Sequence, residues 1–264
     1  MVVGATGTIG KALVRQLVAS GQPVVAVAPR SEQLATLRDV AEPVAVTTIV
    51  GRVESDADAK LMADRLRELG RPLAGVVVAF PCGRFAEVGA ERGRVLDLAT
   101  DDLRDCLQQT LLTQHALARH LIPLLAESGR NATYVIVGGP GSETPWAGYG
   151  HRSIAMAATR MLARVLHDEA LPSGVRVQLL SIDAPVRGDR PAAHECPEWP
   201  AASDVARHVA RLFDRNATDE STNAIVACER GGAAHTPVHE KSTFSDVPSF
   251  LASLRNPTKR ITPQ

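Results

Sequence analysis

The chain has 264 residues, of which 45% are hydrophobic, 22% charged and only 3% aromatic. Basic and acidic residues each number 29, so the formal net charge is zero. A general nucleic-acid binder would show a basic excess, and we therefore expect no nucleic-acid partner. No apolar run approaches the roughly 18 residues of a membrane span, and the amino terminus lacks the pattern of a signal peptide, so no membrane association is expected.

The four cysteines are scattered along the chain, at positions Cys82, Cys106, Cys196 and Cys228. No CxxC pair is present, which indicates a cytoplasmic protein with reduced thiols. The run His194-Glu195-Cys196 contains residue types that bind metals. Because no second cluster stands at ligand spacing, we interpret the run as a loop and predict no metal.

Short apolar runs alternate with helical patterns along most of the chain. The predicted strands cover residues 1–3, 23–28, 44–50, 73–80, 132–137, 175–182 and 224–228. The predicted helices cover residues 11–19, 32–40, 56–69, 101–127, 153–170 and 203–213. This order predicts an α/β fold: a single-domain, Rossmann-like, doubly wound parallel sheet of about seven strands with helices on both faces. The domain is predicted to span residues 1–232, and residues 233–264, rich in Pro, Ser, Thr and charge, to form a C-terminal tail.

A glycine-rich turn, "VVGATGTIGKALVRQL", follows the first strand and opens the first helix. Glycine tolerates positive φ and lets the backbone approach a pyrophosphate, while a helix amino end offers N–H groups and a positive dipole to an anion. The same glycines also permit close helix–strand packing without any ligand. The strand–turn–helix context favours dinucleotide binding. The predicted cofactor-binding residues of the turn are Gly4, Thr6, Gly7, Thr8, Ile9 and Gly10.

The end of the second strand, "AVAPRSEQL", carries Arg30 and no acidic residue. An acid there would hold the ribose 2′-hydroxyl of NAD, whereas a guanidinium suits a 2′-phosphate. NADP(H) is therefore favoured over NAD(H), with Arg30 as a cofactor-binding residue. Two alternatives stay open: Arg30 is a solvated loop residue, or no cofactor is bound.

Three features together resemble the short-chain dehydrogenase/reductase family over residues 1–232. They are the glycine turn, Tyr149 within "GGPGSETPWAGYGHRS" after the fifth strand, and the closing "ATDESTNAIVACERGG". The resemblance implies a homodimer or homotetramer that interconverts a carbonyl and an alcohol of a small-molecule substrate with NAD(P)(H). It also implies four catalytic roles: an acid/base tyrosine, a lysine four residues later that lowers its pKa, a serine on the substrate oxygen, and an asparagine on a proton-relay water.

Carried over residue by residue, most of these roles are missing from this chain. Tyr149 matches the tyrosine, but Ser153 stands where the lysine is expected. The serine position falls on Gly138 or Gly139, and the asparagine position on Thr110. The phenol is kept, and its usual cationic activator is not.

Nearby residues offer substitutes for the missing groups. Ser142 lies just past the glycine pair and is expected to reach a substrate oxygen, and Arg152 is expected to supply a cation near Tyr149. The alternative is that Tyr149 caps or packs at a helix start and Arg152 is solvated. The catalytic candidates are Tyr149, Ser142, Arg152 and Ser153. The resemblance also places Arg52 where the family often has an aspartate on the adenine.

Three functions are compatible with these residues. The favoured one is an NADP(H)-linked oxidoreductase that acts on a carbonyl/alcohol small molecule by an altered mechanism. The second is a catalytically dead dinucleotide-binding or scaffold protein, supported by the joint loss of three roles. The third is a non-redox lyase or cyclase that uses Tyr149, His151 or Asp183 as acid/base.

Overall fold

The structure is a computed structural model, and it describes residues 1–38, 46–80, 93–129, 131–188, 196–214 and 223–228. The chain divides into the units Met1–Gly231 and Gly232–Gln264, and the description concerns the first. Cys82, the His194-Glu195 pair, the predicted boundary at residue 232 and the predicted tail lie outside the described residues.

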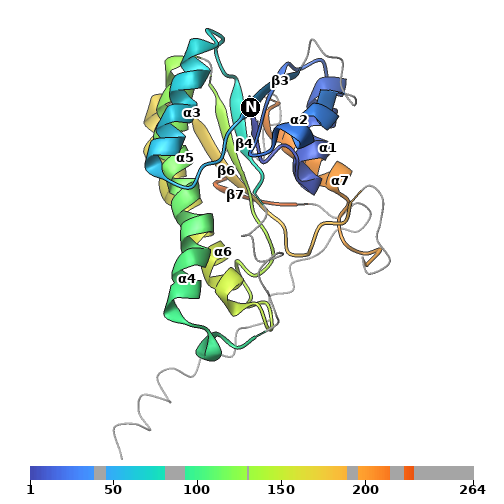
Figure 1. The fold of residues 1–264 in the computed structure, drawn as a ribbon, viewed down its shortest axis with the longest axis vertical. Helices are drawn as coiled ribbons and strands as arrows, with labels where there is room; N and C mark the ends of the chain where they lie inside the picture. Colours follow the sequence, from blue (N-terminus) through green and yellow to red (C-terminus); the bar gives the residue numbers. More distant parts are fainter. Residues whose placement is uncertain (39–45, 81–92, 130, 189–195, 215–222, 229–264) are drawn as a thin grey trace, which may run out of the picture. The chain divides into compact units, whose positions relative to one another are not determined.

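Seven parallel strands form one sheet in the order β3-β2-β1-β4-β5-β6-β7 (Figure 1). The strands are β1 (Val2–Val3), β2 (Val24–Ala28), β3 (Val46–Val50), β4 (Gly75–Val78), β5 (Thr133–Val137), β6 (Arg176–Ser181) and β7 (Ile225–Ala227). The order reverses between β1 and β4, and ligands of open α/β sheets bind at such a reversal, beyond the carboxyl ends of the strands. The predicted doubly wound sheet is confirmed.

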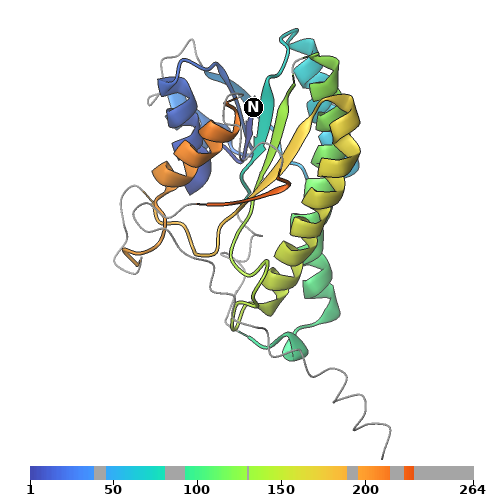
Figure 2. The same ribbon diagram turned by 180° about the vertical axis from the view of Figure 1, so that it is seen from behind.

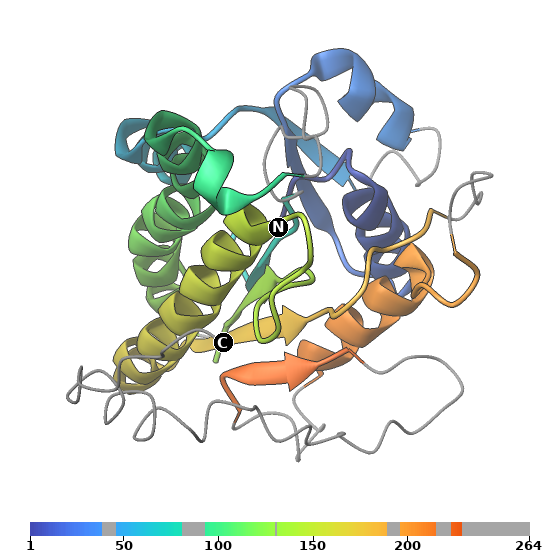
Figure 3. The same ribbon diagram turned by 90° about the horizontal axis from the view of Figure 1, so that it is seen from below.

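Helices cover both faces of the sheet (Figures 2 and 3). One face packs against α1 (Thr8–Ala19), α2 (Ser31–Arg38) and α7 (Ala202–Leu212). The other packs against α3 (Asp56–Glu68), α5 (Thr113–Glu127) and α6 (Gly150–Ala170). The described residues also form the short helices η2 (Val95–Asp97), α4 (Thr100–Leu107) and η4 (Leu171–Ser173). Two apolar layers therefore enclose one sheet, as period-2 strands buried on both faces require.

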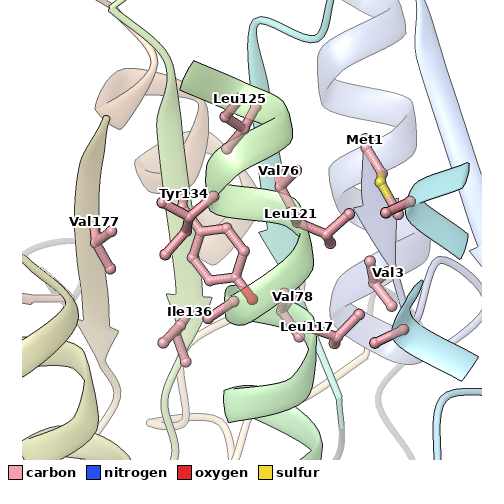
Figure 4. Packing of buried hydrophobic residues seen from close by; sticks show 14 of the residues in the cluster. Met1, Val3, Val76, Val78, Leu117, Leu121, Leu125, Tyr134, Ile136 and Val177 are labelled. Atoms are coloured by element: carbon pink, nitrogen blue, oxygen red, sulfur yellow. The ribbon is translucent and has the colours of Figure 1, made fainter. Parts of the chain in front are cut away.

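One of the two tyrosines of the chain belongs to this core. Tyr134 of β5 is fully buried, and its ring stands among Leu117, Leu121 and Ile136 (Figure 4). Burial raises the pKa of its phenol far above the usual value, and its hydroxyl has no hydrogen-bond partner in the described part of the chain. A tyrosine enclosed in this way packs rather than reacts, which leaves Tyr149 as the candidate for chemistry.

The predicted helix over residues 101–127 is interrupted, so this prediction was wrong in detail. A π-helical turn, η3 (Gln108–Leu112), separates α4 from α5. The Thr113 hydroxyl donates to the Gln108 carbonyl at 2.9 Å, and the Thr110 hydroxyl donates to the Cys106 carbonyl. Hydroxyl groups that donate to carbonyls of the preceding turn compete with the backbone hydrogen bonds of the helix. Short π-helical turns within α-helices often mark functional sites.

Candidate active site

The outer glycines of the amino-terminal turn allow backbone segments to meet. Gly4 has φ +82°, and a Cβ added there would lie 2.5 Å from the Ala79 carbonyl oxygen beside β4. A Cβ on Gly10 would lie only 2.1 Å from the Gly4 carbonyl oxygen. These two glycines therefore let α1 begin directly against the sheet, which is a packing role.

The middle glycine differs from its neighbours. A Cβ on Gly7 would meet only the Gly4 carbonyl oxygen, at an ordinary contact distance of 3.5 Å. Gly7 is the N-cap of α1, no side chain caps the helix, and its first turn holds no acidic residue. The N–H groups of Thr8 and Ile9 belong to the first turn, which has no carbonyl partner inside the helix, and Thr6 lies half-buried in the turn before them. This uncapped end at the strand-order reversal fits a dinucleotide pyrophosphate.

Two arginines follow the neighbouring strands on one side of this turn. Arg30 is exposed two residues beyond β2, and its carbonyl accepts the Leu34 N–H at 3.2 Å at the start of α2. Arg52 is exposed two residues beyond β3 and forms an ion pair with Glu54, with Nη1 and Oε1 2.6 Å apart. Positive charge is therefore present at the carboxyl edge where the sequence predicts a 2′-phosphate.

Tyr149 lies at the first residue before α6, as its N-cap. Its ring stacks on Trp146 with centroids 4.4 Å apart, and the guanidinium carbon of Arg152 lies 5.2 Å from the centroid of the Tyr149 ring. Tyr149 also forms an isolated bridge with Gly93. The structure brings Arg152 to the face of the ring as a cation–π contact, so it is not a merely solvated cation.

Ser142 lies in the loop over residues 138–149, between β5 and α6. Its hydroxyl oxygen is buried and has no hydrogen-bond partner among the described residues. A buried hydroxyl without a partner costs about 1–3 kcal/mol. An oxygen atom of a bound substrate would satisfy it, and the role of Ser142 stays a prediction.

Ser153 serves to hold this loop against α6. Its Oγ accepts the Trp146 N–H at 2.9 Å and donates to the Tyr149 carbonyl at 3.4 Å. Gly141 has φ +95°, and a Cβ there would lie 2.6 Å from the Ser153 Oγ. Loop backbone thus occupies the space into which a longer side chain at position 153 would extend. These contacts favour a structural role for Ser153 over a catalytic one.

Gly138, one of the two positions predicted for the family serine, is constrained in a similar way. A Cβ on Gly138 would lie 2.9 Å from the Leu180 carbonyl oxygen, which accepts the Gly138 N–H at 2.9 Å. Thr110, at the asparagine position, lies in η3 with its hydroxyl engaged by the Cys106 carbonyl. At Gly138 the departure from the family pattern therefore involves close backbone packing as well as the loss of a side chain.

Burial shifts the pKa of two other titratable groups near Tyr149, His151 and Cys106. Burial, with the nearby Arg152 charge, lowers the pKa of His151 and so favours its neutral form. Burial raises the pKa of the Cys106 thiol, which donates to the His151 carbonyl at a sulfur–oxygen distance of 3.7 Å. The guanidinium of Arg152 is the cation in contact with the face of the Tyr149 ring.

Two residues that the sequence analysis did not single out shape this region. Trp146 supplies the second ring of the stack. Arg160 of α6 donates to the Ser181 hydroxyl at 3.2 Å and pairs with Glu143, which ties the loop over residues 138–149 to α6 and β6. The role of Trp146 could have been predicted, because it lies three residues before Tyr149 in the sequence. The contacts of Arg160 could not, because they join residues that are far apart in the sequence.

Hollows occur at both ends of the sheet. One of about 390 Å³ lies beside Tyr149 and is lined by Val95, Trp146 and their neighbours. Another, of about 970 Å³, lies at the amino ends of the strands and contains none of the predicted site residues. We place the site at the carboxyl ends, where Gly7 and Tyr149 are found.

Within the described ranges, no group of three or more His, Cys, Asp or Glu residues could hold a metal ion. No helix of this part of the chain is long and apolar enough to cross a membrane.

Comparison with known proteins identifies the family. A family model described as enoyl-(acyl carrier protein) reductase matches residues 4–227. The chain belongs to the short-chain dehydrogenase/reductase family. An uncharacterized oxidoreductase of Mycobacterium tuberculosis H37Rv is 28% identical over 186 residues, which are 69% of this chain. The match covers 65% of that protein, so the chain spans about two thirds of the length of the curated relatives it matches.

Solved structures share the fold at low sequence identity. A short-chain type dehydrogenase/reductase from Mycobacterium ulcerans has a TM-score of 0.74 at 18% identity, over 86% of both chains. An NADPH-bound short chain oxidoreductase from Pseudomonas aeruginosa PAO1, described as containing an atypical catalytic center, has a TM-score of 0.72 at 19% identity, over 89% of this chain and 96% of that one. A metagenomic short-chain oxidoreductase in complex with NADP has a TM-score of 0.69 at 19% identity, over 86% and 94%.

The two kinds of glycine are expected to respond differently to alanine. Gly10→Ala places a methyl group against fixed backbone and should lower the free energy of unfolding by roughly 1–3 kcal/mol. Gly7→Ala should change it by less than about 1 kcal/mol, and should weaken NADPH binding about tenfold by crowding the pyrophosphate. Urea denaturation and cofactor titration measure both. Equal loss of stability in the two variants would contradict the distinction.

Restoring the family lysine should damage the protein. Ser153→Lys removes the acceptor of the Trp146 N–H and drives a long cationic side chain into the Gly141 backbone. It should lower the free energy of unfolding by about 3 kcal/mol, compared with about 1 kcal/mol for the control Ser153→Ala. Thermal and urea unfolding provide the measurement. A lysine variant as stable as the wild type would show that the space beside Gly141 is open.

Proposed function

We propose that this protein is an NADP(H)-linked oxidoreductase that acts on a carbonyl/alcohol small molecule by an altered mechanism. The observation that carries the proposal is the uncapped amino end of α1 behind Gly7, placed at the reversal of strand order. Arg30 at the end of β2, in place of an acid, supports the preference for NADP(H). Family membership supports the class of reaction, and two structural neighbours are described as bound to NADP or NADPH.

NADP(H), when bound, supplies or accepts the hydride. The first-turn N–H groups behind Gly7 bind the pyrophosphate, and Arg30 binds the 2′-phosphate. Tyr149 exchanges a proton with the substrate oxygen, and the Ser142 hydroxyl donates to the same oxygen. Arg152, over the face of the Tyr149 ring, provides positive charge close to the reacting group in place of the absent lysine. This arrangement is what we mean by an altered mechanism.

Association into a homodimer or homotetramer is part of the proposal. Three large apolar side chains of α6 are exposed in the described protomer: Ile154, Met161 and Val165, at 42%, 55% and 44%. They are spaced by seven and four residues and therefore share one face of the helix. A second copy would cover this face. Cys106 and Cys196 are free thiols, which supports the proposal of a cytoplasmic location.

A catalytically dead dinucleotide-binding protein is the second candidate. It is favoured by the reshaped backbone at the serine and lysine positions, Gly138 and Ser153, which removes two roles together. A scaffold of this kind would keep the glycine turn and lose the function of Tyr149. A non-redox lyase or cyclase using Tyr149 or Asp183 would instead turn over substrate without any nicotinamide.

Cofactor titration tests the proposal directly. We expect NADPH to bind with a micromolar dissociation constant and NADH at least about tenfold more weakly, because only NADPH carries the 2′-phosphate. Nicotinamide fluorescence and calorimetry give both constants. No binding of either nucleotide at millimolar concentration would rule out hydride transfer and leave the non-redox catalyst or the scaffold.

Substitution of the phenol separates the enzyme from the binding protein. With a substrate found by screening carbonyl compounds against NADPH oxidation, Tyr149→Phe should lower kcat by about 10²–10⁴-fold while leaving NADPH affinity unchanged. Tyr134→Phe is the matched control, since that tyrosine is enclosed in the core, and it should keep wild-type kcat. Equal turnover by Tyr149→Phe and the wild type would remove the phenol from the mechanism.

A further inference from the structure

The sheet register places two arginines at equivalent positions of neighbouring strands. β2 and β3 pair in parallel from Val24 with Val46 to Ala28 with Val50. The pairing continues one step further, because the Gly51 N–H donates to the Ala28 carbonyl at 3.0 Å. Arg30 lies two residues after Ala28, and Arg52 lies two residues after its partner Val50. Adjacent strands are about 4.8 Å apart, so the backbones that carry Arg30 and Arg52 leave the sheet as neighbours at its carboxyl edge.

Arg52 has an acidic partner that is itself well fixed. Its guanidinium pairs with the carboxylate of Glu54, at 2.6 Å between Nη1 and Oε1. The backbone of Glu54 is held on both sides: its N–H donates to the Asp58 carboxylate at 3.1 Å, and its carbonyl accepts the Gln108 side-chain amide at 3.0 Å. Glu54 is therefore positioned to neutralise Arg52 when no other anion is present.

An anion that bears two charges would change this pairing. A ribose 2′-phosphate carries nearly two negative charges at neutral pH and offers three acceptor oxygens, and guanidinium groups bind such groups through paired N–H donors. The Arg52–Glu54 pair is exposed to solvent, so its net stabilisation is small and it can be exchanged for a stronger partner. Glu54 would then compete with the 2′-phosphate for Arg52.

We infer that Arg52 joins Arg30 in a two-arginine clamp for the 2′-phosphate of NADP(H), and that Glu54 weakens the clamp by occupying Arg52. The inference rests on the proposed function and deepens it, since it names the residues that set the nucleotide preference. Arg52 is thus a specificity-determining residue, and Glu54 tunes the same preference in the opposite direction.

Calorimetric titration with adenosine 2′,5′-bisphosphate and with 5′-AMP tests the clamp without any turnover. Arg52→Ala should weaken binding of the bisphosphate about tenfold and change 5′-AMP binding less than about twofold, as loss of one charge-assisted contact requires. Glu54→Gln should tighten bisphosphate binding by about threefold, because the competing charge is removed. We expect Arg52→Ala to lower, and Glu54→Gln to raise, the preference for NADPH over NADH in the same way.

Lys60→Ala is the matched control, because Lys60 is an exposed cation of α3 that pairs with Asp64 rather than with residues at the sheet edge. Lys60→Ala should leave the affinities for adenosine 2′,5′-bisphosphate, 5′-AMP, NADPH and NADH unchanged, which would exclude a general effect of net charge. If the wild type prefers NADPH and Arg52→Ala keeps that preference, the clamp is overturned while the proposed function stands. If the wild type binds neither NADPH nor NADH, the proposed function fails and the clamp with it.

Discussion

The close approach of α1 to the sheet is the constraint on which the rest of the site depends. The carbonyl of Gly4 lies so near the backbone of Gly10 that no side chain fits between them, and Gly4 itself lies against the carbonyl of Ala79. This contact fixes the amino end of α1 over β1 and β4, where the order of strands reverses. Because this contact fixes the direction of α1, the positive end of its dipole and its uncapped N–H groups face the reversal of strand order.

Parallel strands then collect residues from distant parts of the chain at that edge. Arg30 and Arg52 follow β2 and β3 on one side of the turn, and Tyr149 follows β5 on the other. An adenosine group and a reactive group bound at opposite ends of this edge would lie on the two sides of the reversal. On the Tyr149 side, a stack of Trp146, Tyr149 and Arg152 stands where the family pattern has a tyrosine and a lysine.

Much of the fold could be predicted from the sequence, because buried parallel strands appear as short apolar runs between amphipathic helices. The order of elements and the strand count followed from runs such as those of β2 and β5. The π turn at η3 was missed, since it depends on where the hydroxyls of Thr110 and Thr113 find carbonyl partners. Propensity alone predicts an unbroken helix there.

Residues of the candidate site could be predicted only where a single short stretch of sequence contains the complete motif. The glycine turn and the position of Tyr149 could be found in this way. The role of Ser153 could not, because it depends on contacts with Trp146 and Gly141 across a loop of irregular backbone. The neighbourhood of Arg30 and Arg52 also needs the strand register, which no single stretch of sequence contains.

The interlocking of the loop over residues 138–149 with Ser153 has a consequence for how this site can evolve. A Cβ at Gly138 would lie close to the Leu180 carbonyl oxygen, and the Ser153 hydroxyl is engaged by the Trp146 N–H. We therefore expect restoring the family serine or lysine at these positions to lower folding stability before it yields any catalytic gain. Such a loss of stability would separate this chain from the usual catalytic residues of the family by intermediates that fold less stably. A design that reinstalls those residues would therefore exchange the loop over residues 138–149 together with both positions, rather than one residue at a time.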